Sequence, residues 1–222
     1  MKIMPAKNAL KEYHENGYYH LYNRGVNKGL IYSDEQDYKN FLWLLKIYLS
    51  AVDLQGESLK APPSHKLKNY FEQIRLIAYC LMPNHFHLMI WQKDPDGINH
   101  FMRSLATKYT MYFNRKYKRI GPLFQGVYKA VLVESEPQLL YLSKYIHRNP
   151  FPVLSAGSLL SNYKHSSYQN YLGLFNQPWI DKDDILGLFS KNPQGSNSYQ
   201  NFVEETDERD LAFIKTLVLE EV

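Results

Sequence analysis

Two histidines separated by one residue place the tightest limit on what this chain can fold into. They lie in residues 81–90, LMPNHFHLMI, directly after an apolar run at residues 74–80. The two runs predict two strands joined by a turn at Pro83. Alternate residues of a strand point to the same face, so His85 and His87 are expected to project together. Such a pair forms a divalent metal site when a third ligand joins it, although similar pairs also occur simply as packing or surface residues.

A second motif, further along the chain, supplies a candidate third ligand. Ser135 is a typical helix cap, and the pattern after it predicts a helix that runs to about Arg148 and stops before Pro150. On this helix Tyr145 and Asn149 lie at i and i+4, so they share one face. Asn149 can add an amide oxygen to the two imidazoles, and Tyr145 would then reach the same metal. That spacing favours Tyr145 over the other tyrosines of the chain as a reactive residue.

The remaining patterns predict an α+β fold. In chain order we expect a strand at residues 17–25, a helix from a cap at Ser33 or Asp34 to about residue 52, the two strands around the histidine pair, a helix at about 98–117, a strand at 127–133, and the helix capped by Ser135. This order resembles that of a ferredoxin-like antiparallel sheet with helices on one face. The last helix is appended to that arrangement.

The character of the sequence changes after Pro150. Small polar residues follow, and short helices are expected at residues 180–189 and about 198–219. We therefore predict a main domain at residues 1–173 and a small helical C-terminal extension at residues 174–222.

The hydropathy of the chain argues against a membrane protein. Its mean hydropathy is −0.45, and no stretch approaches the roughly 18 apolar residues that cross a bilayer. The first residues lack an apolar signal segment, which predicts a cytoplasmic location. The single cysteine, Cys80, excludes an internal disulfide and is expected to be buried.

The composition is compatible with nucleic-acid binding. The chain carries 26 Lys and Arg, 19 Tyr and a net charge of +4. Aromatic rings stack on unpaired bases while cations follow the phosphates, although a tyrosine-rich core explains the same count. A basic series covers the helix at about 98–117 and its exit, which indicates either phosphate contacts or a solvated face. Its members are Arg103, Lys108, Arg115, Lys116, Lys118 and Arg119.

Several motifs together carry a resemblance to a known family. They are GYYHLYNRG at 17–25, AYCLMPNHFH at 78–87, YFN at 112–114, GPLFQG at 121–126, YIHRNP at 145–150 and SSY at 166–168. In this order and rough spacing they closely resemble the HUH-type single-tyrosine transposases. Within that family, the chain most resembles the REP-associated tyrosine transposases of bacteria. The resemblance covers about residues 15–173.

This resemblance implies a fold, a reaction and a set of partners. It implies a ferredoxin-like catalytic domain for single-stranded DNA that bears hairpins, in a bacterial, nucleoid-associated setting. His85, His87 and Asn149 match the ligands of Mg²⁺ or Mn²⁺, and Tyr145 matches the nucleophile. Tyr145 would attack a backbone phosphate, form a 5′-phosphotyrosine link and free a 3′-OH. Because relatives occur as dimers and as monomers, a homodimer is possible.

One departure and several further candidates accompany the resemblance. Relatives usually carry Arg after the GPLFQG motif, where this chain has Val127. Arg24 and Lys129 are candidates for phosphate contacts, because their side chains donate to phosphate oxygens. Gln125 is a further DNA-binding candidate, and His20 either lines the site or packs in the sheet.

Two rival functions therefore stay open. The first is a non-catalytic protein that binds single-stranded DNA hairpins. The second is a metal-dependent nuclease that uses water instead of tyrosine as the nucleophile.

Overall fold

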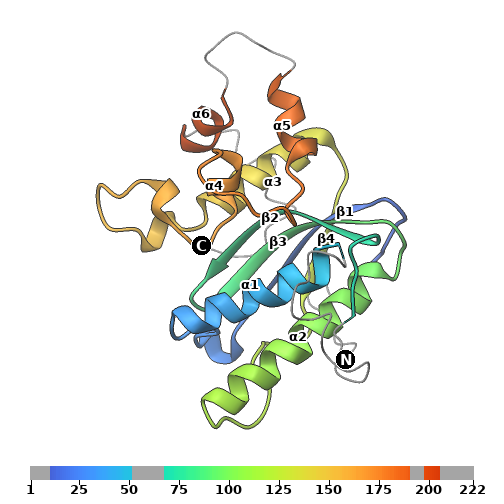
Figure 1. The fold of residues 1–222 in the computed structure, drawn as a ribbon, viewed down its shortest axis with the longest axis vertical. Helices are drawn as coiled ribbons and strands as arrows, with labels where there is room; N and C mark the ends of the chain where they lie inside the picture. The colour runs from blue at the N-terminus through green and yellow to red at the C-terminus, as the bar shows by residue number, and fades with distance from the viewer. Residues whose placement is uncertain (1–10, 52–67, 191–197, 206–222) are drawn as a thin grey trace, which may run out of the picture.

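A computed structural model describes residues 11–51, 68–190 and 198–205 of the chain. Four antiparallel strands form one sheet in the order β2-β3-β1-β4 (Figure 1). They are β1 (Tyr18–Arg24), β2 (Ile74–Met82), β3 (His85–Gln92) and β4 (Lys129–Val133). The principal helices are α1 (Glu35–Leu49), α2 (Gly97–Lys116), α3 (Glu136–Arg148), α4 (Tyr168–Tyr171), α5 (Asp183–Ser190) and α6 (Tyr199–Glu204). Short 3-10 turns lie at Val26–Lys28, Phe151–Val153 and Leu160–Asn162.

The two faces of the sheet are covered by different helices. α1 and α2 pack on one face, where Leu21 and Leu88 of the sheet meet Phe41 and Phe101 of the helices. This arrangement confirms the predicted α+β fold with an antiparallel sheet. α3 covers the opposite face, so the helix that the sequence appends to the ferredoxin-like order supplies a third layer (Figure 1).

Local sequence signals set the ends of the helices. Asp34 caps α1, and its carboxylate accepts from the Asp37 amide while the Asp37 carboxylate accepts from the Asp34 amide. This reciprocal pair is a capping box, and it decides between the two predicted caps. Ser135 caps α3 as predicted. The predicted strand at 127–133 begins two residues later, at Lys129, because Gly126 turns the chain with a φ of +73°.

The described part of the C-terminal extension shares a core with α3. Ile185 of α5 and Val203 of α6 are buried together with Leu142 and Ile146 of α3. The predicted domain division at residue 173 stays a prediction. Residues 206–219 of the predicted last helix lie outside the described residues.

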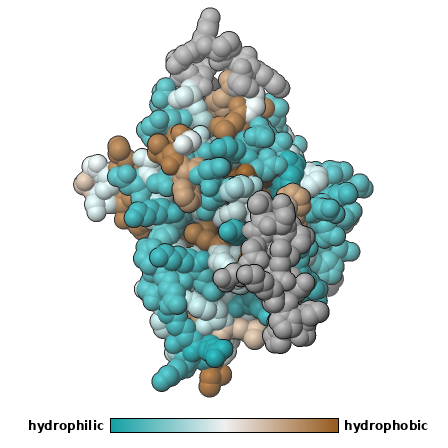
Figure 2. Space-filling model, viewed as in Figure 1, coloured by the Kyte–Doolittle hydropathy of each residue, from teal (hydrophilic) through white to brown (hydrophobic). Residues whose placement is uncertain are grey.

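On the face shown in Figure 2, the surface over α1 and α2 is mostly hydrophilic, and more hydrophobic residues lie in the upper half, where Figure 1 places α3 to α6. Large apolar side chains exposed between α3 and α5 are Phe151, Val153, Leu159, Leu174 and Phe175. No helix within the described residues has the length and apolar character to cross a membrane. Cys80 is buried, as expected.

Candidate metal and nucleophile site

The histidine pair lies at the start of β3, at one end of the strands, on the sheet face that α3 covers. β2 ends at Met82 and β3 begins at His85, so Pro83 and Asn84 form the connecting turn. Neighbouring backbone fixes this turn, since the Gly25 amide donates to the Asn84 carbonyl at 2.8 Å. His85 and His87 point to the same side, with ring centroids 5.0 Å apart.

α3 brings the second motif onto this pair. His85 Nε2 lies 3.1 Å from Asn149 Oδ1, which joins β3 to the C-terminal end of α3. One turn earlier, the half-buried Tyr145 ring lies edge-on to His87, with centroids 5.4 Å apart. Residues far apart in the sequence therefore meet at one point, as the spacing predicted. The roles assigned to them stay predictions.

Each imidazole of the pair is held through its Nδ1 atom. His87 Nδ1 is 2.9 Å from Nε2 of His20, which is fully buried in β1. His85 Nδ1 is 2.7 Å from Asn84 Oδ1. His20 therefore packs in the sheet behind His87, and its ring contacts this ligand candidate directly. The sequence predicted Asn84 only as a turn residue and not as a partner of His85. The position of Asn84 directly before His85 in the sequence could have indicated this contact.

His87 is buried and uncharged. Burial, then the nearby His20 and His85, lowers the pKa of His87 well below its usual range. Its Nε2 atom is buried and has no hydrogen-bond partner among the residues that the structure describes. A buried nitrogen without a partner is costly, and a neutral imidazole nitrogen is a common metal ligand. These features fit a metal ion held by His87 Nε2, His85 Nε2 and Asn149 Oδ1.

The donor set is unusual because one member is an amide. Within the described residues, no group of three or more His, Cys, Asp or Glu is placed to hold a metal. Two imidazoles and one amide leave any metal largely dependent on water and substrate for its other ligands. Such a site is open, which is a feature of catalytic rather than structural metals.

Three of the predicted DNA-binding residues lie near the pair. Arg24 pairs with His85 across β1 and β3, and its Nε donates to Gln125 Oε1 at 2.6 Å. Lys129 pairs with Tyr22, the strand neighbour of His87. By strand alternation, Arg24 and Lys129 point to the same face as the histidines. Two cations thus lie on the sheet face that carries the candidate metal site, Arg24 next to His85 and Lys129 two strands away from His87.

The basic residues of α2 lie on the other side of the sheet. Exposed members of this series are Arg103, Lys108, Arg115, Lys118 and Arg119. The sheet separates them from the histidine pair, so a bound strand would reach both only around the edge of the molecule.

Lys116 is an exception within that series. Its Nζ forms ion pairs with Asp34 at 2.7 Å and with the buried Asp37 at 2.8 Å. It therefore ties the end of α2 to the start of α1. Its predicted contact with DNA stays a prediction.

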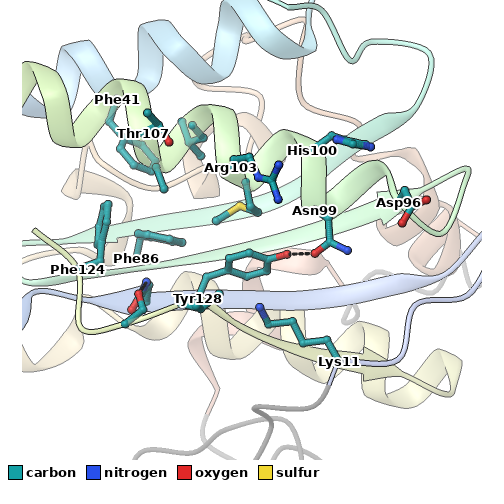
Figure 3. A pocket seen from close by; sticks show the side chains of 16 residues that line it. Lys11, Phe41, Phe86, Asp96, Asn99, His100, Arg103, Thr107, Phe124 and Tyr128 are labelled. Atoms are coloured by element: carbon teal, nitrogen blue, oxygen red, sulfur yellow. Dashed lines mark hydrogen bonds between the residues drawn. The ribbon is translucent and has the colours of Figure 1, made fainter. Parts of the chain in front are cut away.

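A pocket of about 640 Å³ lies between α2 and the loop that precedes β4 (Figure 3). Its apolar wall includes Phe86 and Phe124, and Lys11 and Arg103 add positive charge. Across from α2, Tyr128 donates to Asn99 Oδ1 at 2.9 Å. The loop links this pocket to the histidine site, because Phe124 lines the pocket while the next residue contacts Arg24.

Buried polar contacts anchor α3 on the side away from the histidine pair. His147 lies 2.6 Å from Tyr199 Oη through Nδ1 and 2.7 Å from Ser167 Oγ through Nε2. Arg148 Nη1 donates to the last carbonyls of α6, including Val203 at 2.8 Å. These contacts fix how α3 is rotated, and hence where Tyr145 points.

Comparison with known proteins supports the resemblance predicted from the motifs. A family model described as IS200-like transposase matches residues 59–149, which contain all four candidate catalytic and metal-binding residues. Among solved structures, a REP-associated tyrosine transposase bound to a REP hairpin has a TM-score of 0.50 at 14% identity, over 76% of this chain and 87% of that one. At this identity the likeness shows a shared fold.

A second solved structure is more distant. A Deinococcus radiodurans R1 protein described as a transposase has a TM-score of 0.36 at 16% identity, over 65% of this chain and 97% of its own. That score is too low to indicate a shared fold. No curated protein matches the chain.

Proposed function

We propose, from its likeness to IS200-like transposases, that this chain is a metal-dependent tyrosine transposase that cleaves and rejoins single-stranded DNA. The observation that carries the proposal is the meeting of α3 with β3. Asn149 contacts His85 while Tyr145 lies against His87, so a nucleophile candidate and three ligand candidates share one site. A structural role alone would not call for a buried imidazole nitrogen without a partner.

The metal would be held by His85, His87 and Asn149. When bound, a divalent ion polarises the phosphate and offsets the negative charge that develops on it. Imidazole nitrogens suit first-row transition ions, and an amide oxygen suits harder ions such as Mg²⁺ and Mn²⁺. Of the two ions predicted, Mn²⁺ fits this mixed donor set better.

Tyr145 would supply the nucleophile. Its hydroxyl oxygen forms a bond to a backbone phosphorus while the bond from that phosphorus to the 3′ oxygen breaks. The tyrosine proton is lost, and the departing 3′ oxygen gains one. The 5′-phosphotyrosine link keeps the energy of the phosphodiester, so the reverse reaction with a 3′-OH rejoins DNA without ATP.

Arg24 and Lys129 would bind the phosphates that flank the reacting one. Both are cations on the same face of the sheet as the histidine pair. Arg24 already donates to Gln125, which places the Gln125 amide next to the guanidinium. Their charge favours a polyanion at this edge of the sheet.

The pocket would accept an unpaired base of the same strand. Phe86 and Phe124 offer aromatic surface, and Arg103 and Lys11 lie close enough to the pocket to attract a phosphate. A strand that crosses the loop before β4 would pass from this pocket to Arg24. We infer that the DNA carries hairpins, because the similar solved protein is bound to one.

A non-catalytic hairpin-binding protein is the alternative. The observation that favours it is Val127, which is 69% exposed where relatives usually carry Arg. Weaker binding of the strand near the site would leave recognition without efficient cleavage. A homodimer stays a prediction as well.

Strand exchange tests the proposal. Two single-stranded hairpin DNAs with flanks of different length, one of them labelled, would be incubated with the protein and Mn²⁺ and without ATP. Transfer should create a labelled strand of a new length, and EDTA should abolish it. Cleavage without exchange would indicate the water-using nuclease. Binding with neither product, over a panel of hairpins, would leave the binding protein.

A further inference from the structure

His20 lies beside both the candidate ligand His87 and the candidate nucleophile Tyr145. It lies on β1, in the interior of the sheet, and is fully buried. Its ring contacts His87 and also lies edge-on to Tyr145, with centroids 6.0 Å apart. The Tyr22 ring flanks it at 4.9 Å. Burying a polar ring in such a place costs free energy of folding unless its nitrogen atoms form hydrogen bonds.

The contact between His20 and His87 is an in-plane hydrogen bond. The planes of the two rings differ by 20°, and their centroids lie 5.1 Å apart. The joined atoms, His20 Nε2 and His87 Nδ1, are 2.9 Å apart. Rings joined edge to edge by one short bond have such a centroid distance, whereas rings stacked face to face would lie closer.

The direction of this bond decides what His87 can do. If His87 Nδ1–H donates to His20 Nε2, a lone pair is left on His87 Nε2. If His20 Nε2–H donates instead, His87 Nε2 carries the proton and becomes a buried donor without an acceptor. The first arrangement prepares a metal ligand, and the second blocks it.

His85 has the same arrangement. Its Nδ1 lies 2.7 Å from Asn84 Oδ1 and its Nε2 lies 3.1 Å from Asn149 Oδ1, and both amide oxygens only accept. With the proton on Nδ1, at the shorter contact, the Nε2 lone pair and Asn149 Oδ1 face each other as two ligands of one cation would. Both imidazoles therefore present Nε2 to the same point, each held from behind through Nδ1.

We propose that His20 is a positioning residue that accepts the Nδ1 proton of His87 and so fixes the His87 Nε2 lone pair toward the metal. This inference rests on the proposed metal-binding role of the histidine pair. A hydrogen-bond acceptor behind a metal-bound histidine orients the ring and makes it a better ligand. Here the acceptor is another imidazole, supplied by a different strand.

Nitrogen-15 NMR of the metal-free protein tests the bond itself. Long-range proton–nitrogen spectra distinguish a protonated Nδ1 from a protonated Nε2. We expect His87 to carry its proton on Nδ1. A proton on Nε2 would overturn the proposal, whatever the protein does to DNA.

Titration with Mn²⁺ tests the consequence, with binding measured by calorimetry. His20→Phe keeps an aromatic ring but removes the acceptor, and it should weaken Mn²⁺ binding by about 10- to 100-fold. His20→Gln places an amide oxygen near the position of Nε2, and it should restore affinity to within a few fold. Circular dichroism would establish that both variants are folded.

His87→Ala separates this proposal from the proposed function. If His87→Ala abolishes Mn²⁺ binding while His20→Phe binds as the parent does, His20 has no positioning role and the metal site stands. If the parent protein binds no Mn²⁺, the proposed metal fails, and the NMR result alone decides the role of His20. If His20→Phe does not fold, the NMR result on the parent again decides.

Discussion

Tyrosine is a poor nucleophile at neutral pH, because its hydroxyl has an unperturbed pKa of about 10. A tyrosine that attacks phosphate therefore depends on its surroundings, and in this chain they come from α3 and β3. Tyr145 lies against His87, and its helix delivers Asn149 to His85. Among the three candidate metal ligands, Asn149 contributes an amide oxygen, whereas His85 and His87 contribute imidazole nitrogens.

Replacement of Asn149 tests the third ligand. Asn149→Ala removes the amide oxygen, so Mn²⁺ affinity should fall at least about tenfold, the lower limit for loss of even an outer partner. Asn149→Asp keeps an oxygen at the site and adds negative charge, so it should bind Mn²⁺ at least as well as the parent. Calorimetry would measure both.

The exposed Asn162 provides a matched control for this comparison. Asn162→Ala should leave Mn²⁺ binding unchanged. Equal affinity of Asn149→Ala and the parent would exclude Asn149 as a ligand.

At the scale of elements, α1 and α2 are joined at their ends by Lys116. Its ammonium group bridges Asp34 and Asp37, and the Asp37 side chain is fully buried. Lys116→Met leaves that carboxylate with hydrogen bonds from Tyr112 and Tyr117 but without its cation. The free energy of unfolding should fall by about 1–3 kcal/mol, as measured by urea denaturation.

Lys108→Met is the control, because Lys108 is an exposed residue of the same helix. It should change the free energy of unfolding by no more than about 0.5 kcal/mol. Equal effects of the two substitutions would contradict the structural role of Lys116.

α3 is anchored by a histidine that stays neutral. Burial lowers the pKa of His147 to about 3, so the folded state resists its protonation. In the unfolded chain this histidine takes up a proton below about pH 6.5, whereas in the folded chain it does so only near pH 3. The free energy of unfolding therefore has its full value above about pH 6.5 and decreases as the pH falls toward 3. His147 alone should lower the free energy of unfolding by about 2 kcal/mol between pH 7.5 and pH 5.

His147→Gln tests this contribution through the pH dependence of urea denaturation. The variant cannot titrate, so its free energy of unfolding should fall less over this range than that of the parent. The same fall in both proteins would show that His147 is not the group responsible.

The elements were predictable from local patterns, and the pairings in space were only partly so. Strand alternation and the spacing of Tyr145 and Asn149 predicted which side chains meet. The bond between His20 and His87 was not predictable, because it depends on which strand lies next to β3. The ion pairs of Lys116 depend likewise on how α1 and α2 pack, so its sequence neighbours made it look like an ordinary surface cation.

At the scale of the whole molecule, positive charge lies on both sides of the sheet, and the loop before β4 joins them. Val127 is in this loop, is 69% exposed and lines the pocket. Val127→Arg should tighten binding to single-stranded hairpin DNA. It should also raise the magnitude of the slope of log affinity against log salt by up to about one.

Fluorescence anisotropy over a salt series would measure this change. Val153→Arg is the control, since Val153 is 52% exposed and lies in the turn after α3, whereas Val127 lies in the loop before β4. It adds the same charge away from the pocket and should have a smaller effect. Equal slopes for the two variants would mean that the loop does not lie along the DNA.

The tyrosine mechanism requires a covalent bond between Tyr145 and DNA, and trapping that bond is its most direct test. The protein and a Tyr145→Phe variant would be mixed with labelled single-stranded hairpin DNA from the flanks of its own gene, with Mn²⁺ and then with EDTA. We predict a complex that survives denaturation and forms only with Tyr145 and metal. An adduct in the Tyr145→Phe variant, or cleavage by the parent without any adduct, would contradict the tyrosine mechanism.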